Sequence, residues 1–323
     1  MTEAFVHLSV LGAEAPRALV TDPDGLYVDG TFGRGGHSRR ILGMLSPRGR
    51  LFAFDRDPAA VEAAREIDDP RFRIIHEPFS AMREALGSIG ISAVDGVFLD
   101  IGVSSPQIDD ASRGFSFRFD GPLDMRMDTT RGETAAEWLG RASEAELRRV
   151  IADYGEERFA GKIARAIVSE REKAPILTTK TLAALVERVV PRNRRDAQQH
   201  PATRTFQAVR IQVNGELDEL AAALEAAGAL LKPQGRLAVI AFHSLEDRIV
   251  KRFFERTAHP ERALDPRLPI PADRLPKPLF ADVARILPSK AECEVNPRAR
   301  SAVLRVGTRT AQPWRASGEG CGR

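Results

Sequence analysis

The fold is decided by the stretch Val28-Asp29-Gly30-Thr31-Phe32-Gly33-Arg34-Gly35-Gly36-His37-Ser38. It extends a short apolar segment that starts at Leu26, and it leads into an amphipathic pattern with Ile41, Leu42 and Leu45. The apolar segment predicts a strand, and the pattern after it predicts a helix. Glycines at such a turn permit positive φ and let a ligand approach the backbone without meeting a Cβ atom. The stretch therefore predicts a nucleotide site in an α/β fold, without specifying the nucleotide.

Strand and helix signals keep alternating through the first hundred residues and resume late in the chain. Further strands are predicted at Arg50–Asp55, Phe72–His76, Val94–Asp100, Gly235–Phe242 and Ser301–Val306. A helix is predicted to begin near Pro58, because the first turn of a helix tolerates proline. Strands that alternate with helices predict a parallel, doubly wound sheet with right-handed crossovers. The predicted fold class is therefore α/β.

The long interruption in this alternation contains helical patterns and no convincing strand. Ser143 to Glu146 has the capping-box pattern, and apolar residues recur at helical spacing from Phe159 and again from Leu182. Residues 258–278 contain six prolines and are expected to form a loop. The expected domain bounds are 1–106 with 200–310 for a discontinuous sheet domain, 107–199 for an all-helical insertion, and 311–323 for a disordered tail, because nothing after Thr310 has the pattern of a packed segment.

Composition limits the class of protein. The 323 residues have a net charge of +3 with arginine as the dominant cation, which permits a polyanionic partner without requiring one. The two cysteines, Cys293 and Cys321, exclude a disulfide framework and a cysteine-rich zinc site. No apolar run reaches the length of a membrane span, and the first residues lack a signal-peptide pattern. These features predict a soluble, cytoplasmic protein without a membrane partner.

Acidic residues at strand ends indicate the kind of cofactor. Asp55 ends the second strand, 22 residues after Gly33, where a carboxylate can accept hydrogen bonds from both ribose hydroxyls. Capping of the helix near Pro58 is the alternative role for Asp55. Asp29 precedes the glycine turn and Asp100 ends the fourth strand, so together they would repel a pyrophosphate and favour an ammonium or sulfonium group. S-adenosylmethionine has both groups; the alternative is that both acids are ordinary strand-end residues.

The segment after the fourth strand, Ile101 to Gln107, indicates the methyl acceptor. It is a small-residue turn with a proline, at the place where amino-methyltransferases position the exocyclic nitrogen of a base. Because the lone pair of such a nitrogen is delocalised into the ring, the site must hold it in line with the methyl group and polarise it. A carbon acceptor would need a cysteine nucleophile, and neither Cys293 nor Cys321 is placed in the sheet core. Nitrogen is therefore the favoured acceptor.

Eight segments, in chain order, resemble motifs of one protein family. They are Asp29–Ser38, Leu99–Gln107, Arg113–Phe117, Pro122–Met127, Tyr154–Arg158, His200–Arg210, Phe242–Arg248 and Asn296–Ser301. The family is that of the bacterial 16S ribosomal RNA cytosine-N4 methyltransferases. The resemblance runs from about residue 5 to about residue 308, and several of the segments are long and unusual.

The resemblance implies a Rossmann-like class I methyltransferase that uses S-adenosylmethionine to modify N4 of a cytidine in the decoding region of 16S rRNA. Carried over position by position, it implies cofactor contacts at Gly35, Gly36, His37, Asp55, Phe79, Asp100 and Gln107. Phe79 follows the third strand, where an aromatic ring could flank the adenine. Because a base inside a helix cannot reach the cofactor, the target cytidine is expected to be unstacked. The resemblance designates no catalytic residue.

Arginines favour RNA as the macromolecular partner. Between Glu187 and Arg210 there are six arginines and two acids. Arg204 and Arg210 are expected to contact RNA, since arginine pairs with phosphates and stacks on unpaired bases. A solvated helix face is the alternative for any one of them.

Two histidines are candidates for chemistry. His243 could contact the target nucleotide or act as a general base, and a structural role is as well supported, whereas Ser244 is expected to cap the next helix. His37 has no second ligand at chelating spacing, so no metal is expected.

Two other classes of protein compete with a methyltransferase. An NAD-dependent oxidoreductase would share the glycine turn and Asp55. A non-catalytic RNA-binding protein on the same fold would bind rRNA without transferring a methyl group. Asp29, Asp100 and the turn that follows Asp100 argue against both.

Overall fold

The computed structural model describes residues 9–191, 200–265, 267 and 270–314. The chain divides into two compact units, residues 1–102 with 217–323 and residues 103–216. These bounds differ from the expected domain bounds chiefly at the end of the second unit. Helix α10 (Thr203–Asn214) belongs to that unit because it buries Phe206 and Val209 in a core made of helices.

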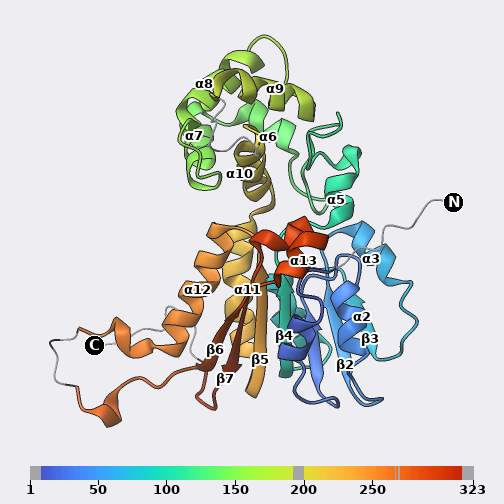
Figure 1. Ribbon diagram of the computed structural model, residues 1–323, viewed down its shortest axis with the longest axis vertical. Coiled ribbons are helices and arrows are strands. Elements are labelled where there is room, and N and C mark those ends of the chain that lie inside the picture. Colours follow the sequence, from blue (N-terminus) through green and yellow to red (C-terminus); the bar gives the residue numbers. More distant parts are fainter. Residues whose placement is uncertain (1–8, 192–199, 266, 268–269, 315–323) are drawn as a thin grey trace. The chain divides into compact units, whose positions relative to one another are not determined.

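The first unit is built around one seven-stranded sheet (Figure 1). Its strands, in spatial order, are β3 (Phe72–Ile75), β2 (Arg50–Phe54), β1 (Leu26–Asp29), β4 (Val94–Asp100), β5 (Leu231–Ala241), β7 (Val303–Arg309) and β6 (Phe280–Ile286). The strands from β3 to β5 pair in parallel, whereas β7 is antiparallel to both of its neighbours. This architecture confirms the predicted α/β fold class. Sequence analysis missed β6, because Asp282 to Arg285 are all exposed and show no apolar alternation.

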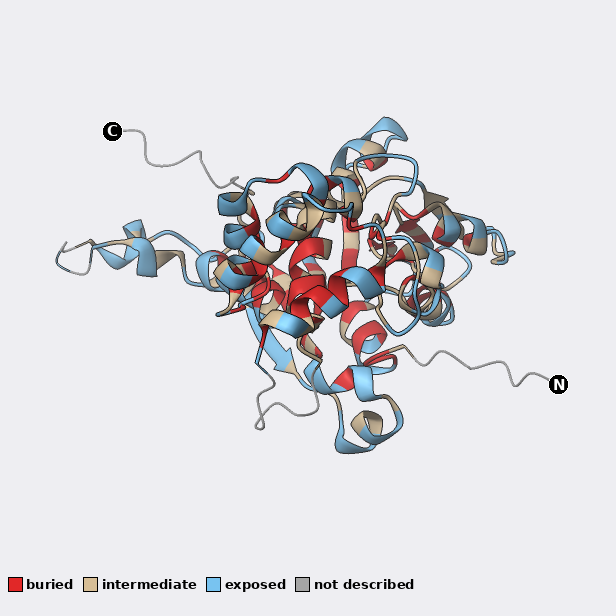
Figure 2. Ribbon diagram, turned by 90° about the horizontal axis from the view of Figure 1, so that it is seen from above, coloured by how far each residue is buried: buried red, intermediate tan, exposed pale blue. Residues whose placement is uncertain are grey.

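Each face of the sheet has its own core, because successive residues of a strand point to opposite faces. Val28 and Leu99 pack on one side with helices α4 (Met82–Ser88), α11 (Glu216–Leu230) and α12 (Ser244–Ala258). Tyr27 and Phe98 pack on the other side with α1 (Glu14–Leu19) and α2 (Gly36–Leu42). Burial of both faces explains why these strands are almost continuously apolar. Figure 2 shows buried residues gathered on the inner faces of the helices, with exposed residues on their outer faces.

Helices make up the second unit in the part that the structure describes. They are α5 (Ser105–Asp109), α6 (Ala135–Arg141), α7 (Glu144–Asp153), α8 (Ala160–Arg171), α9 (Thr179–Val189) and α10. A single bridge between Pro122 and Thr178 is the β pairing found among those residues. Ser143 caps α7, as its capping-box pattern predicts, by accepting a hydrogen bond from the backbone N–H of Glu146. The fully buried Trp138 of α6 is the largest side chain of this core.

The segments between and after the last strands contain further structure. The proline-rich segment 258–278 holds two short 3-10 turns, η4 (Pro260–Ala263) and η5 (Ala272–Arg274). Trp314 packs on Phe253 and Phe280, with ring centroids 6.2 and 6.3 Å away. The expectation that nothing packs after Thr310 is therefore wrong for Trp314, because α12 and β6 leave aromatic rings for it to cover. The rest of the expected tail, 315–323, lies outside the described residues.

No helix in the described ranges is both long enough and apolar enough to cross a lipid bilayer.

Candidate active site

Three acidic residues gather at one edge of the sheet, where its parallel strands end. Asp29 is the last residue of β1, Asp100 is the last residue of β4, and Asp55 directly follows β2. β1 lies between β2 and β4, with Asp29 opposite Ala53 on one side and Phe98 on the other. In open α/β sheets, ligands bind outside the carboxyl ends of the strands, at the point where the strand order reverses. β1 and β4 form that point here, so these acids border the expected ligand site.

The glycine turn is shaped so that side chains would not fit. Gly35 has a φ of 73°, and a Cβ atom built on it would lie 2.8 Å from the ring of Phe32. A Cβ atom on Gly36, the first residue of α2, would lie 2.1 Å from Oγ of Ser9. Gly35 and Gly36 therefore bring bare backbone to the start of α2, as a loop that receives a ligand requires.

Asp29 is hydrogen-bonded through both of its carboxylate oxygens to the loop itself. It is fully buried, and its two carboxylate oxygens accept hydrogen bonds from Oγ of Ser38 at 2.6 Å and from the backbone N–H of Thr31 at 3.1 Å. Burial raises the pKa of Asp29, and the hydrogen bond from Ser38 opposes that rise. The interpretation of Asp29 as a direct partner of a cationic ligand is therefore corrected: it holds the glycine turn in place. Sequence reasoning missed Thr31 and Ser38, although both stand within the quoted stretch.

Asp55 does not cap the helix that follows it. Its oxygens accept hydrogen bonds from the backbone N–H groups of Gly33 and Asp57, both at 2.8 Å. Asp57 caps α3 (Pro58–Ala64) by accepting a hydrogen bond from the N–H of Ala59. Burial raises the pKa of Asp55 to about 6. Asp57, not Asp55, is therefore the cap of α3, and the contact between Asp55 and a ribose stays a prediction.

His37 and Asp100 form a pair whose polar atoms are not satisfied within the protein. Nε2 of His37 lies 3.5 Å from Oδ2 of Asp100, and the histidine is only 5% exposed. Both ring nitrogens of His37 and Oδ1 of Asp100 are buried without a hydrogen-bond partner among the described residues. The imidazole rests against the ring of Phe98, with centroids 4.6 Å apart. Leaving a buried polar atom unpaired costs about 1–3 kcal/mol, so these atoms are typical of a site that a ligand completes.

Phe79 lies beside the glycine turn. It begins the 3-10 turn η1 (Phe79–Ala81) after β3, and its ring is half-buried. A Cβ atom on Gly30 would lie 3.1 Å from Cβ of Phe79. The backbone N–H of Ser80 donates a hydrogen bond to Glu219 of α11, which fixes the turn. This position suits an aromatic ring next to the adenine, although Phe79 also borders the core.

Gln107 belongs to the second unit. It is buried, and Oε1 of its side chain accepts a hydrogen bond from the backbone N–H of Ser104 at 2.9 Å. This contact is half of a capping box at the start of α5. Its contact with the cofactor stays a prediction.

The two arginines predicted to contact RNA differ in how far their charge is already paired. Arg210 forms two hydrogen bonds of 2.8 Å with the carboxylate of Glu216, and its side chain is only 15% exposed. Arg204 is half-exposed, and one guanidinium nitrogen lies 3.5 Å from the backbone oxygen of Glu156. Arg204 is thus the better placed of the two for a phosphate. Most of the basic run between Arg188 and Arg204, residues 192–199, lies outside the described residues.

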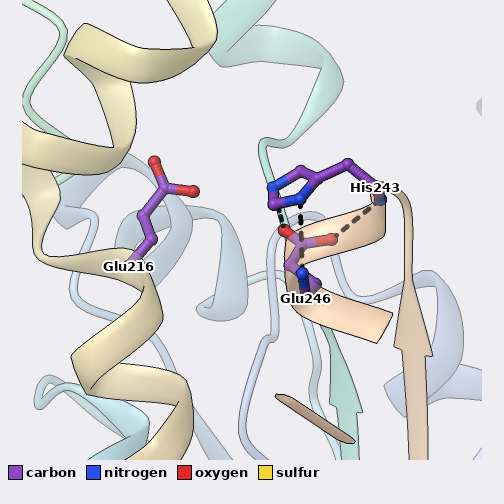
Figure 3. Close-up of side chains that lie close together, drawn as sticks. All are labelled: Glu216, His243 and Glu246. Carbon is purple, nitrogen blue, oxygen red and sulfur yellow. Dashed lines mark hydrogen bonds and ion pairs between the residues drawn. The ribbon is translucent and has the colours of Figure 1, made fainter. Parts of the chain in front are cut away.

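His243 caps α12, a role that the sequence assigned to Ser244 (Figure 3). Its Nδ1 accepts a hydrogen bond from the backbone N–H of Glu246 at 3.3 Å, and its Nε2 lies 3.0 Å from Oε1 of Glu246. The other oxygen of that fully buried carboxylate accepts hydrogen bonds from the N–H groups of Phe242 and His243. The prediction for Ser244 is wrong because His243, one residue earlier, is the N-cap of α12, and its Nδ1 accepts the hydrogen bond from the backbone N–H of Glu246. The hydrogen bond at Nδ1 gives His243 a structural role, while its Nε2 is buried without a hydrogen-bond partner among the described residues, and a role as general base stays a prediction.

Comparison with known proteins gives a family for the whole chain. A model of the MraW methylase family matches residues 4–310. Two curated relatives, from Burkholderia vietnamiensis and Burkholderia mallei, are each named ribosomal RNA small subunit methyltransferase H. Both are 58% identical to this chain, over 313 and 315 residues, which is 96% of the chain and 99% and 100% of the relatives.

Solved structures give a more distant likeness. An rRNA methylase from Streptococcus thermophilus shares 11% identity with a TM-score of 0.35, and the match covers 92% of each chain. A SAM-dependent O-methyltransferase from Thermotoga maritima shares 9% identity with a TM-score of 0.41, over 94% of this chain and 66% of that one.

Proposed function

The chain belongs to the MraW methylase family, and we propose that it methylates the N4 amine of a cytidine in the decoding region of 16S rRNA. Membership confirms the family resemblance and S-adenosylmethionine as the cofactor. The name of the relatives supports small-subunit rRNA as the substrate. The proposed partner is rRNA within the small ribosomal subunit, in the cytoplasm, and no metal takes part.

The observation that carries this proposal is the pair of buried His37 and partly exposed Asp100, with buried polar atoms that are unpaired among the described residues, at the carboxyl edge of the sheet. A cationic cofactor fits this chemistry, because Asp100 offers an unpaired carboxylate oxygen in a low-dielectric place. S-adenosylmethionine supplies an electrophilic methyl group. Asp100 and His37 would hold the methionine part of the cofactor. Asp55 would accept hydrogen bonds from the ribose hydroxyls, and Phe79 would lie against the adenine.

The site must also orient the weakly nucleophilic amine of the target base and exclude water from it. The turn that follows Asp100 is where the target amine is proposed to bind, with acceptors that polarise its N–H bonds. No covalent nucleophile is needed, since the amine attacks the methyl group directly. After transfer, the nitrogen loses a proton to solvent or to a nearby acceptor. His243 is not required for that step, since solvent can take the proton.

Nucleoside analysis of the product tests the proposal. Small ribosomal subunits from cells that lack this enzyme would be incubated with it and with tritiated S-adenosylmethionine, and the rRNA nucleosides separated by mass spectrometry. We expect label in N4-methylcytidine at one position. Label in C5-methylcytidine would refute the nitrogen acceptor. RNA binding without any label would instead support the non-catalytic alternative.

A further inference from the structure

The segment Asn296–Ser301 resembles a family motif, yet the proposed function gives it no role. The structure places it in the 3-10 turn η6 (Pro297–Ser301), between α13 (Lys290–Val295) and β7. β7 runs antiparallel to β5, and Val303 at its start lies opposite Ala241 at the end of β5. η6 therefore lies at the carboxyl edge of the sheet, the edge that carries the candidate cofactor site (Figure 1).

Several contacts fasten this turn to the body that holds the glycine loop. Ala299 is fully buried in the core that also contains Leu11 and Ile41 of α2. The backbone N–H of Leu11 donates a 2.6 Å hydrogen bond to Glu292 of α13. Asn296 caps the turn by accepting a hydrogen bond from the N–H of Arg298 at 3.2 Å. The turn is thus a fixed part of the first unit.

Cations stand on the outer side of this fixed turn. Arg298 and Arg300 are exposed on either side of the buried Ala299, and Lys290 is exposed at the start of α13. Arg300 makes no hydrogen bond or ion pair with any residue in the described ranges. Of the acids nearby in sequence, Glu292 is engaged by Leu11, which leaves Glu294 as the exposed one. We call Arg298 and Arg300 the edge arginines.

Sheet register shows how close the edge arginines come to the site of chemistry. Asp100 lies opposite Ile240, and Ile240 lies opposite Leu304. Two strand spacings, about 10 Å, therefore separate Asp100 from Leu304. Arg300 stands four residues before Leu304, beyond the end of the sheet. A nucleotide that presents its base near Asp100 would carry its backbone within reach of this turn.

We propose that Arg298 and Arg300 bind backbone phosphates of the rRNA next to the target cytidine, and so hold the target strand against the methyltransferase sheet. The proposal rests on the proposed function for the identity of the RNA. Arginine suits the task because its planar guanidinium donates paired hydrogen bonds to phosphate oxygens and stays charged. Phosphate contacts of this kind position a nucleic acid without reading its sequence.

The test compares a double variant, Arg298→Ala with Arg300→Ala, against wild type and a matched control. The control is Arg48→Ala, an exposed arginine just before β2, at the opposite edge of the parallel strands. Affinity for unmethylated small ribosomal subunits is measured by filter binding over a range of salt concentrations, and cofactor affinity by calorimetry. We expect the double variant to bind RNA about tenfold more weakly, with a salt slope reduced by about 1.4 for two lost phosphate contacts. Its cofactor affinity should match wild type.

The outcomes separate this proposal from the proposed function. RNA affinity and salt slope equal to wild type in the double variant would overturn the role of the edge arginines, as would an equal loss in Arg48→Ala. Wild type that binds small subunits but forms no N4-methylcytidine would refute the proposed function. A selective loss of binding in the double variant would, in that case, still support the edge arginines as an RNA contact.

Discussion

Two histidine–carboxylate pairs lie at the same edge of the sheet and differ in what completes them. After β5, Nδ1 of His243 and Oε2 of Glu246 are hydrogen-bonded in the capping box of α12, while Nε2 of His243 lies 3.0 Å from Oε1 of Glu246 and is buried without a hydrogen-bond partner among the described residues. After β1 and β4, His37 and Asp100 stand 3.5 Å apart, with buried atoms that no described residue pairs. The two pairs thus differ in degree: one ring nitrogen of His243 is hydrogen-bonded in a helix cap, whereas neither ring nitrogen of His37 has a hydrogen-bond partner among the described residues.

This difference teaches how to separate structural from ligand-binding residues. A buried polar group is costly to leave unpaired, so a residue with both of its ring nitrogens unpaired, such as His37, is a candidate for a partner from outside the chain. Asp29 and Asp55 divide in a similar way. Asp29 is fully buried and bonded by Ser38 and Thr31, whereas Asp55 accepts only backbone N–H groups and keeps partial exposure.

The largest effect is expected from Asp100→Asn. This variant keeps the shape of the side chain and removes the charge that would face the cationic cofactor. Since a hydrogen bond to a charged group contributes about 1.5–3 kcal/mol, S-adenosylmethionine should bind about 100-fold more weakly by calorimetry. The thermal unfolding midpoint should stay near that of wild type. An affinity within twofold of wild type would mean that Asp100 is not the incomplete half of a cofactor site.

A smaller effect is expected from Asp55→Asn, with a pH signature. Burial raises the pKa of Asp55 to about 6 from its ordinary value of 3.8, so the folded state binds the proton more tightly than the unfolded state. Ionisation of Asp55 therefore lowers the free energy of unfolding as pH rises from 3.8 to about 6. Above that range the ligand-free variant should be more stable than wild type, by about 1–3 kcal/mol in urea unfolding.

The same variant should bind S-adenosylmethionine about tenfold more weakly at neutral pH, because the ribose hydroxyls lose a charged acceptor. Wild-type affinity should also fall as pH drops below about 6, where Asp55 is protonated. The asparagine variant should lack that pH dependence. A variant that is less stable than wild type and binds the cofactor normally would assign Asp55 to structure alone.

The smallest effects are expected from substitutions at His243 and His37, with asparagine compared at both positions. Asparagine is a good N-cap, so His243→Asn should keep the stability of wild type, while His243→Ala should lose about 1 kcal/mol in urea unfolding. Neither should change cofactor affinity. His37→Asn should weaken cofactor binding about fivefold, as expected for one neutral hydrogen bond. If His243→Asn weakened cofactor binding as much as His37→Asn, the contrast between the two pairs would be wrong.

Local patterns predicted the regular elements and failed where a partner came from far along the chain. The glycine turn, the parallel strands and the capping of α7 by Ser143 follow from short stretches of sequence. The edge strand β6 went unpredicted because an exposed strand shows no apolar period. Trp314 was expected to be unpacked because its partners, Phe253 and Phe280, precede it by tens of residues.

The candidate site shows the same limit. Strand-end spacing pointed to Asp55 and Asp100, the family resemblance added Gly35, Gly36 and His37, and the sheet does place them at one edge. Spacing could not tell that Asp57 rather than Asp55 caps α3. A side chain chooses among nearby donors by distance, and that choice exists only after the strands are assembled.

By itself, the sequence of this protein determined an α/β fold, a glycine turn for a nucleotide and acids at the ends of its strands, because backbone freedom and apolar period are local properties. Only the tertiary structure decided which acids are hydrogen-bonded by side chains and loops of the chain and which keep an unpaired oxygen among the described residues. It also decided that Arg298 and Arg300 share the edge with Asp100, since β7 is antiparallel to β5 and therefore begins at that edge, directly after the turn that carries the two arginines. Strand order is set by packing across the whole sheet, which no short segment contains.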